Sequence, residues 1–348
     1  MKNRGRRTWG WALGLSVVLA LLGGVASAKK PPKPPPEPAT GGIYYYDDGS
    51  WYLVSPDGRN PTALDLGDGA TWPTHRAPSG QLHNGKRWFL ERREVDGEQN
   101  RYPDGNQHRQ LWAVSEDGES EAMLLYDTSI EIVHHWAWWG DQVLQWVPGD
   151  QAVSFVALVW DGNNVVEGAI YKLPIAYEDG NPSGANGDPE LVVASTTYRD
   201  PVGRWHVRCE RGFAWSPDGS AIVYCNHNAD YNELYPGEVR ITEIDTPYAS
   251  LLLAEPVLLR AHCGPDWSVN DEILYASSSN GSTIHLINAD GTNPRALLQY
   301  RRAGFWHEWP SFSPDGESIV YCLGPMYTYS LGSGRTKRLG TGVYPYWR

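Results

Sequence analysis

The sequence predicts an all-β protein, a six-bladed β-propeller whose blades are four-stranded antiparallel sheets. Three observations predict it. Two segments that begin at Phe213 and Ser311 are close copies of one hairpin pattern, a second hairpin pattern alternates with the first, and each end of the folded region supplies only part of a repeat. Repeats of roughly 40–50 residues that each hold four short strands are typical of propeller blades.

The first hairpin pattern is an aromatic strand end, a Pro-Asp-Gly turn and an alternating apolar strand. It reads FAWSPDGSAIVYC at 213–225 and SFSPDGESIVYC at 311–322. Proline presets φ at the first turn position, and glycine supplies the positive φ that closes the turn. Degenerate copies occur at 266–275, at 138–146, and at 77–80 with 85–90 as the return strand.

The second hairpin pattern is an alternating strand, an Asp-Gly turn and a further strand, which is a strong hairpin signal. It reads WYLVSPDGRNPTAL at 51–64, LWAVSEDGESEAML at 111–124 and IHLINADGTNPRAL at 284–297. One hairpin of each kind makes a unit of four antiparallel strands. The stretch 178–188, EDGNPSGANGD, is interpreted as a loop insertion in one of these units.

The two ends of the folded region complement each other. Five complete units are predicted to start near residues 72, 134, 210, 264 and 309. The stretch 343–348 then supplies only a first strand, whereas the stretch from Ile43 to Tyr46 begins a unit without a first strand. We expect these terminal strands to pair and close a sixth blade, because closure removes exposed sheet edges.

The sequence before the propeller divides into two segments. Residues 1–28 are predicted to be a signal peptide, since basic residues precede an apolar stretch and Ala26-Ser27-Ala28 offers a small-residue cleavage pattern. The alternative is a membrane anchor that is never cut. Residues 29–42 form a proline-rich spacer of extended polyproline type, and the propeller is assigned to residues 43–348. The protein is therefore expected to be exported, to the periplasm or outside the cell.

Charge excludes one class of partner. The formal net charge is −12, and residues 1–28 carry four basic and no acidic residues, so the remainder is more acidic still. An acidic surface repels phosphate backbones and anionic lipids. We therefore expect no nucleic-acid partner, no membrane association after signal cleavage, and a monomer.

The Ser-Pro-Asp-Gly turns at 216–219 and 313–316 resemble the repeat of the TolB-type β-propeller family and of the noncatalytic propeller in prolyl oligopeptidase-like enzymes. The resemblance covers about residues 43–348 and implies the propeller fold, not an activity. TolB has a further domain before its propeller, for which this chain has no room. The Gly-x-Ser-x-Gly motif of the peptidases' hydrolase domain is absent.

Histidines precede the first strand of every complete unit, and we expect them to converge at the mouth of the central channel. Neutral imidazoles in a ring could hold a divalent metal ion, with Glu308, Glu210 and Asp266 as helpers. This arrangement resembles the histidine-bound manganese site of oligogalacturonate lyases, although the ligands cannot be matched one by one. The alternative is that the imidazoles cap strands or bond to carbonyl groups. The candidates are His75, His134 with His135, His206, His262 and His307.

Tryptophans lie beside the same histidines and could stack on sugar rings or cap an apolar ligand. The alternative is packing between neighbouring blades. The tryptophans in question are Trp72, Trp136, Trp205, Trp306 and Trp309.

Four cysteines allow three complete disulfide pairings, and export would permit them. Cys209 and Cys225 flank one predicted hairpin, so we favour a disulfide between them, with Cys263 as a competitor for either. Cys225 and Cys322 hold equivalent positions two units apart, which makes a direct bond between them unfavourable.

Two classes of function follow from these patterns. The first is a noncatalytic module that binds a protein, peptide or glycan through the histidine-bearing loops. The alternative is a metal-dependent carbohydrate-active enzyme with a histidine-lined central site. No catalytic residue is assigned, and the sequence indicates no cofactor other than a divalent metal ion.

Overall fold

The computed structural model describes residues 41–66, 77–95, 97, 101–133, 143–200, 203–210, 212–227, 236–258, 264–277, 282–300 and 308–348. They belong to one compact unit, Pro38–Arg348. Within these ranges every regular element is a β-strand. The predicted signal peptide and almost all of the predicted spacer lie outside the described residues. In the described part of the chain, no helix is long and apolar enough to cross a membrane.

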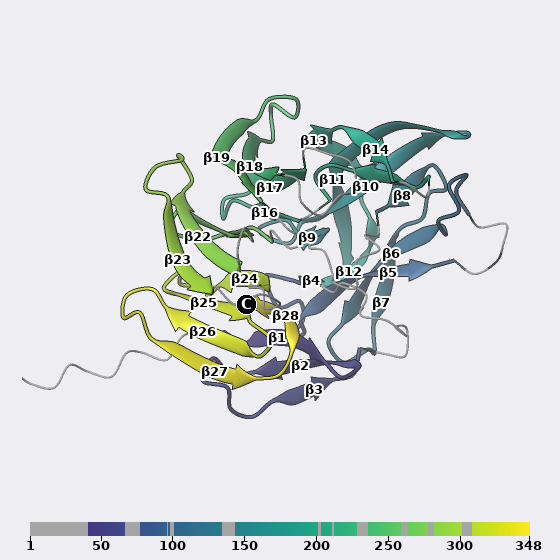
Figure 1. Cartoon of the computed structure of the whole chain (residues 1–348). Helices are drawn as coiled ribbons and strands as arrows, with labels where there is room; N and C mark the ends of the chain where they lie inside the picture. Colours follow the sequence, from purple (N-terminus) through teal and green to yellow (C-terminus); the bar gives the residue numbers. More distant parts are fainter. Residues whose placement is uncertain are drawn as a thin grey trace, which may run out of the picture. The chain divides into compact units, whose positions relative to one another are not determined.

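The strands form six antiparallel sheets in a ring, which we number as blades 1 to 6 from the first complete unit (Figure 1). Blade 1 consists of β4 (Ala77–Pro78), β5 (Trp88–Glu94), β6 (Arg109–Ser115) and β7 (Glu121–Leu125). Blade 2 consists of β8 (Ile130–Ile132), β9 (Leu144–Trp146), β10 (Ala152–Asp161), β11 (Asn164–Glu178), β12 (Asn181–Ala185) and β13 (Glu190–Ser195). Blade 3 consists of β16 (Phe213–Trp215), β17 (Ala221–His227), β18 (Pro236–Glu243) and β19 (Leu251–Leu258).

Blade 4 consists of β20 (Asp266–Trp267), β21 (Glu272–Ser277), β22 (Ser282–Asn288) and β23 (Arg295–Tyr300). Blade 5 consists of β24 (Glu308–Phe312), β25 (Ser318–Cys322), β26 (Met326–Ser330) and β27 (Thr336–Gly340). Blade 6 consists of β28 (Val343–Trp347), β1 (Ile43–Asp47), β2 (Ser50–Val54) and β3 (Thr62–Leu64). An additional hairpin between blades 2 and 3 pairs β14 (Thr197–Arg199) with β15 (Trp205–Val207).

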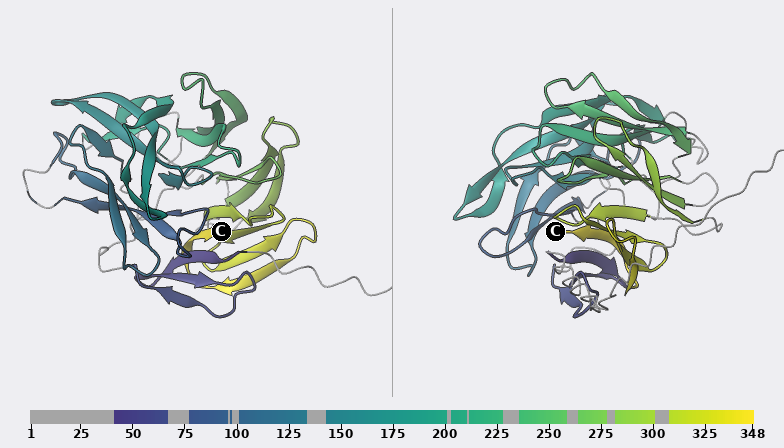
Figure 2. Two further views of the ribbon diagram at one scale, coloured as in Figure 1. Left: turned by 180° about the vertical axis from the view of Figure 1, so that it is seen from behind. Right: turned by 90° about the vertical axis from the view of Figure 1, so that its left-hand side faces the viewer.

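Blade 6 confirms the predicted closure of the ring. The sheet order is β28-β1-β2-β3, and Ile43 stands opposite Trp347 in the β1–β28 ladder. Two backbone hydrogen bonds between Gly42 and Arg348 extend this ladder, at 2.7 and 3.0 Å. Figure 2 shows the purple N-terminal strands beside the yellow C-terminal strands from two further directions. The first strand of blade 6 therefore comes from the opposite end of the folded sequence.

The Ser-Pro-Asp-Gly turns form as the residue types predict. The Ser216 hydroxyl donates to the Asp218 carboxylate at 2.7 Å, and the Ala221 amide donates back to the Ser216 hydroxyl at 2.9 Å. Gly219 follows with a φ of 72°, in the region that glycine adopts at no steric cost. The turn at Ser313 repeats this geometry, with a Gly316 φ of 69°. The polar groups of the turn are therefore satisfied within the turn and by the first residue of β17.

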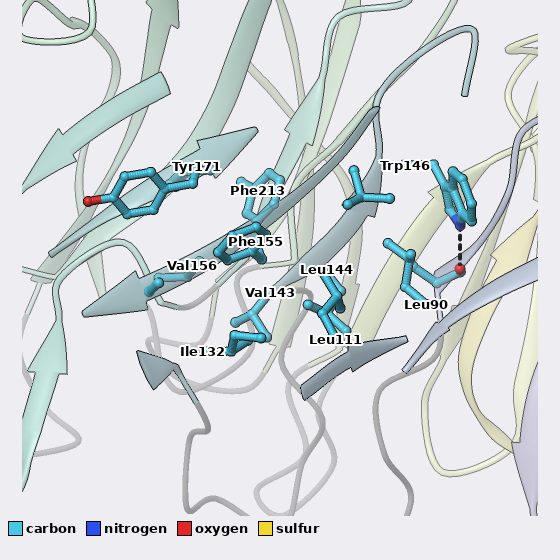
Figure 3. Close-up of a cluster of buried hydrophobic side chains, with 14 of the residues drawn as sticks. Leu90, Leu111, Ile132, Val143, Leu144, Trp146, Phe155, Val156, Tyr171 and Phe213 are labelled. Atoms are coloured by element: carbon cyan, nitrogen blue, oxygen red, sulfur yellow. Dashed lines mark hydrogen bonds between the residues drawn. The ribbon is translucent and has the colours of Figure 1, made fainter. Parts of the chain in front are cut away.

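The hydrophobic core lies between neighbouring blades. The cluster in Figure 3 brings together apolar side chains of blades 1, 2 and 3, among them Leu90, Phe155 and Phe213, each fully buried. The Trp146 indole joins two of these blades by donating to the Ala77 carbonyl at 3.0 Å. Burial of apolar area on both faces of each sheet is the main stabilising term for such a ring.

Blade 2 corrects two details of the sequence interpretation. A degenerate copy of the first hairpin was predicted at 138–146, but Leu144–Trp146 is a first strand, whose hairpin partner is the later strand β10. The turn comes later, at Val147–Asp150, where Gly149 and Asp150 have φ of 86° and 55°. The stretch 178–188 is not a loop insertion, because β11 runs on to Glu178 and pairs with β12. The long strand β11 thus continues into this stretch and forms a hairpin with β12, although the composition of these residues suggested a loop.

Candidate ligand-binding face

Of the residues singled out in the sequence, those that the structure describes, such as His206, Asp266 and Trp309, lie at the end of the blades where the innermost strands begin. We call this end the loop face. Antiparallel pairing brings three other parts to the same end, namely the connection between β5 and β6, the strand β8, and the hairpin of β14 and β15. Most of the predicted histidines, His75, His134, His135, His262 and His307, lie outside the described residues.

His206 is the one candidate metal ligand whose surroundings the structure describes. Its side chain is buried in the β14–β15 hairpin, with Nδ1 3.2 Å from Glu210 and Nε2 3.4 Å from Asp200. Its ring stacks on Tyr198 with 5.1 Å between centroids, and the Tyr198 hydroxyl donates to Glu210 at 3.1 Å. Both ring nitrogens therefore face carboxylates of the protein itself.

The charge state of His206 follows from those partners. Burial alone would lower its pKa, but the carboxylates of Glu210 and Asp200 outweigh burial and raise the pKa above the ordinary value. The imidazolium form donates a proton from each nitrogen, whereas a metal ligand needs an unprotonated one. In this geometry His206 fastens the hairpin through two side-chain carboxylates, which is a structural role other than the strand cap or carbonyl bond considered for the histidines.

The predicted helpers have structural partners as well. Asp266 accepts hydrogen bonds from the amides of Phe312 at 2.7 Å and Trp267 at 3.0 Å, which links blade 4 to blade 5. Burial raises the pKa of Asp266, and the nearby Arg348 opposes that shift. The backbone of Glu308 begins β24, but its side chain lies outside the described part. Among the described residues, no group of three or more His, Cys, Asp or Glu could hold a metal ion.

Of the predicted stacking tryptophans, Trp205 and Trp309 are described. Trp309 is 2% exposed and packs edge-on against Tyr344 of the next blade, with 4.4 Å between ring centroids. Trp205 is only partly buried, and the exposed Arg199 guanidinium lies 4.5 Å above its ring. Such cation–π stacking holds a planar cation in place. Trp309 therefore serves blade packing, while Trp205 and Arg199 form a polar and aromatic surface on the loop face.

A cluster that sequence reasoning missed supports this surface. The Trp205 amide donates to Asp104 Oδ2 at 3.2 Å, across the gap between the hairpin and the β5–β6 connection. Asn106 links the same carboxylate to Glu131 of β8, through its Nδ2 atom at 3.1 and 2.7 Å. The sequence signal was the Pro103-Asp-Gly turn, which matches the repeat turns but falls within a long connection.

The structure does not form the favoured disulfide between Cys209 and Cys225. Cys209 is a buried thiol outside any disulfide, and burial raises its pKa to about 12. Cys225 is disulfide-bonded. The reason is that the two side chains lie on opposite faces of blade 3. Cys209 packs in the core shared with blade 2, whereas Cys225 packs against Ile273 and Tyr275 of blade 4.

Comparison with known proteins identifies no family for this chain. No protein-family model and no curated protein matches the chain. Among solved structures, TolB from Acinetobacter baumannii is 11% identical over 86% of this chain and 68% of its own, with a TM-score of 0.45. An oligogalacturonate lyase in complex with manganese is 11% identical over 78% of this chain and 73% of its own, with a TM-score of 0.44.

A puromycin-hydrolyzing peptidase from Mycobacterium tuberculosis is 11% identical over 87% of this chain and 45% of its own, with a TM-score of 0.44. Similarity at this level transfers no activity. The chain is thus a six-bladed β-propeller of antiparallel blades, the class that its own strand pairing defines.

Proposed function

We propose that this propeller is an exported, TolB-like binding module that holds a protein, peptide or glycan on its loop face, in the periplasm or outside the cell. The observation that supports it best is the surface formed by Trp205 and Arg199. It stands on a hairpin that is additional to the blades, so the ring would close without it. An added element that presents an aromatic ring and a cation is a reasonable place for recognition.

The chemistry of this surface suggests its ligand. The Arg199 guanidinium keeps several N–H donors while it stacks, and those donors suit carboxylate and hydroxyl oxygens. The Trp205 ring offers an apolar face that suits a sugar ring or an apolar side chain. A ligand that joins an acidic group to such a face fits both partners, whereas the net charge of −12 disfavours a polyanion.

The hairpin is held firmly enough to present this surface without rearrangement. His206 ties it to Glu210 and Asp200, and Asp104 accepts the amide of Trp205 itself. Groups that are positioned before a ligand arrives lose less conformational entropy on binding. We therefore expect binding to weaken when the supporting carboxylates are removed, even though they do not face the ligand.

A binding screen with paired variants tests the proposal. Purified full-length protein would be applied to peptide and glycan arrays, and the hits measured again with Trp205→Ala and Arg199→Ala. We expect each variant to lose roughly tenfold or more in affinity, as truncated aromatic and arginine anchors do. Trp112→Ala and Arg93→Ala are the matched controls, because the same cation–π pair, at 4.4 Å, recurs on blade 1. Equal losses in both pairs of variants, or none, would reject this surface.

The alternative, a metal-dependent carbohydrate-active enzyme, depends on His75, His135, His262 and His307, since His206 has carboxylate partners on both sides. Elemental analysis of purified protein tests it directly. Bound manganese, zinc or calcium at one ion per chain would favour the enzyme, and no uptake of these ions on addition would reject it.

A further inference from the structure

A buried carboxylate, Glu131, and a half-buried one, Asp104, share one amide group where blade 1 meets blade 2. The Asn106 Nδ2 atom carries two hydrogens, and it donates to Asp104 at 3.1 Å and to Glu131 at 2.7 Å. The Asn106 backbone amide also donates to Asp104, at 3.1 Å. The Asn106 side chain is thus a hydrogen-bonded bridge between the two carboxylates.

This amide fastens the loop Tyr102–His108 to blade 2. Glu131 is 1% exposed, and its second carboxylate oxygen accepts the Trp160 indole N–H at 2.9 Å. On the same loop, the Tyr102 ring stacks on Trp160 with 5.5 Å between centroids, and its hydroxyl donates to the Ile130 carbonyl at 2.7 Å. The loop therefore rests on β8 and β10 through one apolar contact and two polar ones.

The same loop also reaches the β14–β15 hairpin. Asp104 Oδ2 accepts both the Asn106 amide and the backbone amide of Trp205. A change in the position of Asp104 would consequently move Trp205, whose indole ring stacks against the Arg199 guanidinium. The loop thus lies between Glu131 and the surface proposed to bind ligand.

Charged and titratable groups face Glu131 from each neighbouring element. The loop contributes Asp104 and Tyr102, β6 contributes Arg109, and the connection before β8 contributes Asp127, which faces Tyr102. The Arg109 guanidinium lies 3.3 Å from the Glu94 carboxylate and 3.5 Å from the Ile132 carbonyl, so Glu131 is not the only group that its positive charge stabilises. The ring centroids of His108 and Tyr102 lie 4.3 Å apart, and burial lowers the pKa of His108.

The balance of these groups favours the neutral form of Glu131. Burial is the largest cause and Asp104 the second, and together they raise the pKa of Glu131 to about 7 against the opposing effects of Arg109, Trp160 and Asn106. The stabilisation that belongs to the protonated form is complete below the ordinary value of 4.5 and is lost as the pH rises to about 7. Neutral pH therefore falls where this carboxyl changes charge.

We propose that protonation of Glu131 fastens the Tyr102–His108 loop to blade 2, so that the loop loosens as the pH rises through neutrality. Above that pH, the buried Glu131 and the half-buried Asp104 are both carboxylates, and Asn106 bridges two like charges. Opening of the loop relieves the repulsion and hydrates Glu131. This device does not depend on the proposed ligand, although it would adjust the surface around Trp205.

Hydrogen exchange of the backbone amides tests the proposal in the full-length protein. Peptides that cover residues 101–110 would be compared at about pH 5.5 and about pH 8, after correction for the intrinsic pH dependence of exchange. If Glu131 regains its ordinary pKa in the open loop, linkage predicts roughly a 25-fold rise in the opening equilibrium between these two conditions. In Glu131→Gln the side chain stays neutral, so protection should be the same at both pH values.

Two variants complete the test. Asp104→Asn removes the like charge, so the midpoint of loop opening should move to lower pH, and this result can be read even if Glu131→Gln folds poorly. Glu121→Gln is the control, because Glu121 is half exposed and pairs with Arg93 on blade 1 and is not among the groups that act on Glu131, so its midpoint should stay nearly unchanged. Equal protection of the wild-type loop at both pH values, or the same pH dependence in Glu131→Gln, would overturn the proposal.

Discussion

Removal of one side chain at the closure of the ring should destabilise the whole propeller. Trp347 on β28 is 2% exposed and packs with Ile43 of β1 and with Val320 and Met326 of blade 5. The backbone of Trp347 also pairs with that of Ile43 in the β1–β28 ladder, which joins the two ends of the propeller sequence. A change to alanine therefore removes apolar contacts from both sides of the closing blade at once.

The size of the effect follows from burial. Replacing a buried Trp with Ala costs about 3–5 kcal/mol, which combines the lost transfer free energy with the cavity left behind. Domains are commonly stable by about 5–15 kcal/mol, so Trp347→Ala should remove a large fraction of the free energy of unfolding. Tyr248→Ala is the control, because that ring is 80% exposed and its loss should cost less than about 0.5 kcal/mol.

Urea unfolding followed by tryptophan fluorescence and by circular dichroism provides the measurement. A cooperative ring should give one transition, with a lower midpoint and an unchanged slope in Trp347→Ala. If the two probes separated, blade 6 would be unfolding ahead of the other blades. A midpoint equal to that of Tyr248→Ala would refute the reasoning, since the closing strand would then carry no measurable stability.

Three further changes test other parts of the structure. Gly342→Ala should destabilise by about 2 kcal/mol or more in thermal unfolding, because φ is 134° there and a Cβ atom would overlap the Tyr45 ring; a neutral result would contradict that packing. Ser313→Ala should cost about 1–2 kcal/mol, since the Ser313 hydroxyl bonds to the Asp315 carboxylate and to two backbone groups of the turn; an unchanged denaturation midpoint would argue against it. His206 has a raised pKa, so its contribution to stability should be complete below the ordinary value of 6.5 and decline at higher pH. Unfolding free energies measured at several pH values above 6.5 should therefore fall less steeply in His206→Asn than in the wild type, and an equal fall in both proteins would assign the decline to other groups.

The fold could be predicted from the sequence because the turn motifs are recognisable in short stretches of residues. The side chains of Ser216-Pro-Asp-Gly219 find their hydrogen-bond partners within five residues along the chain, so the local sequence predicts the turn. The closure by residues 343–348 followed from counting strands. The strands of blade 2 were harder to predict. The turn at Val147–Asp150 contains Pro-Gly-Asp instead of Pro-Asp-Gly, and the repeat before it is degenerate.

The candidate site was less predictable, because its contacts join distant parts of the chain. Nothing local in the sequence indicates that Asn106 bridges Asp104 and Glu131, or that Trp205 bonds to Asp104. The histidine pattern identified His206, but spacing could not show that carboxylates occupy both ring nitrogens. The disulfide prediction used proximity along one hairpin and did not consider which face of the sheet each cysteine occupies.

The pairing of Ile43 with Trp347 also has a consequence during synthesis. The two residues are about 300 positions apart in the chain, so β1 is made long before its partner and must wait with an unpaired edge. Contacts between such distant positions form slowly, and an exposed strand edge can pair with another molecule meanwhile. Slow translation or strong overexpression should therefore favour aggregation through β1, and chaperones that cover this edge should raise the yield of folded protein.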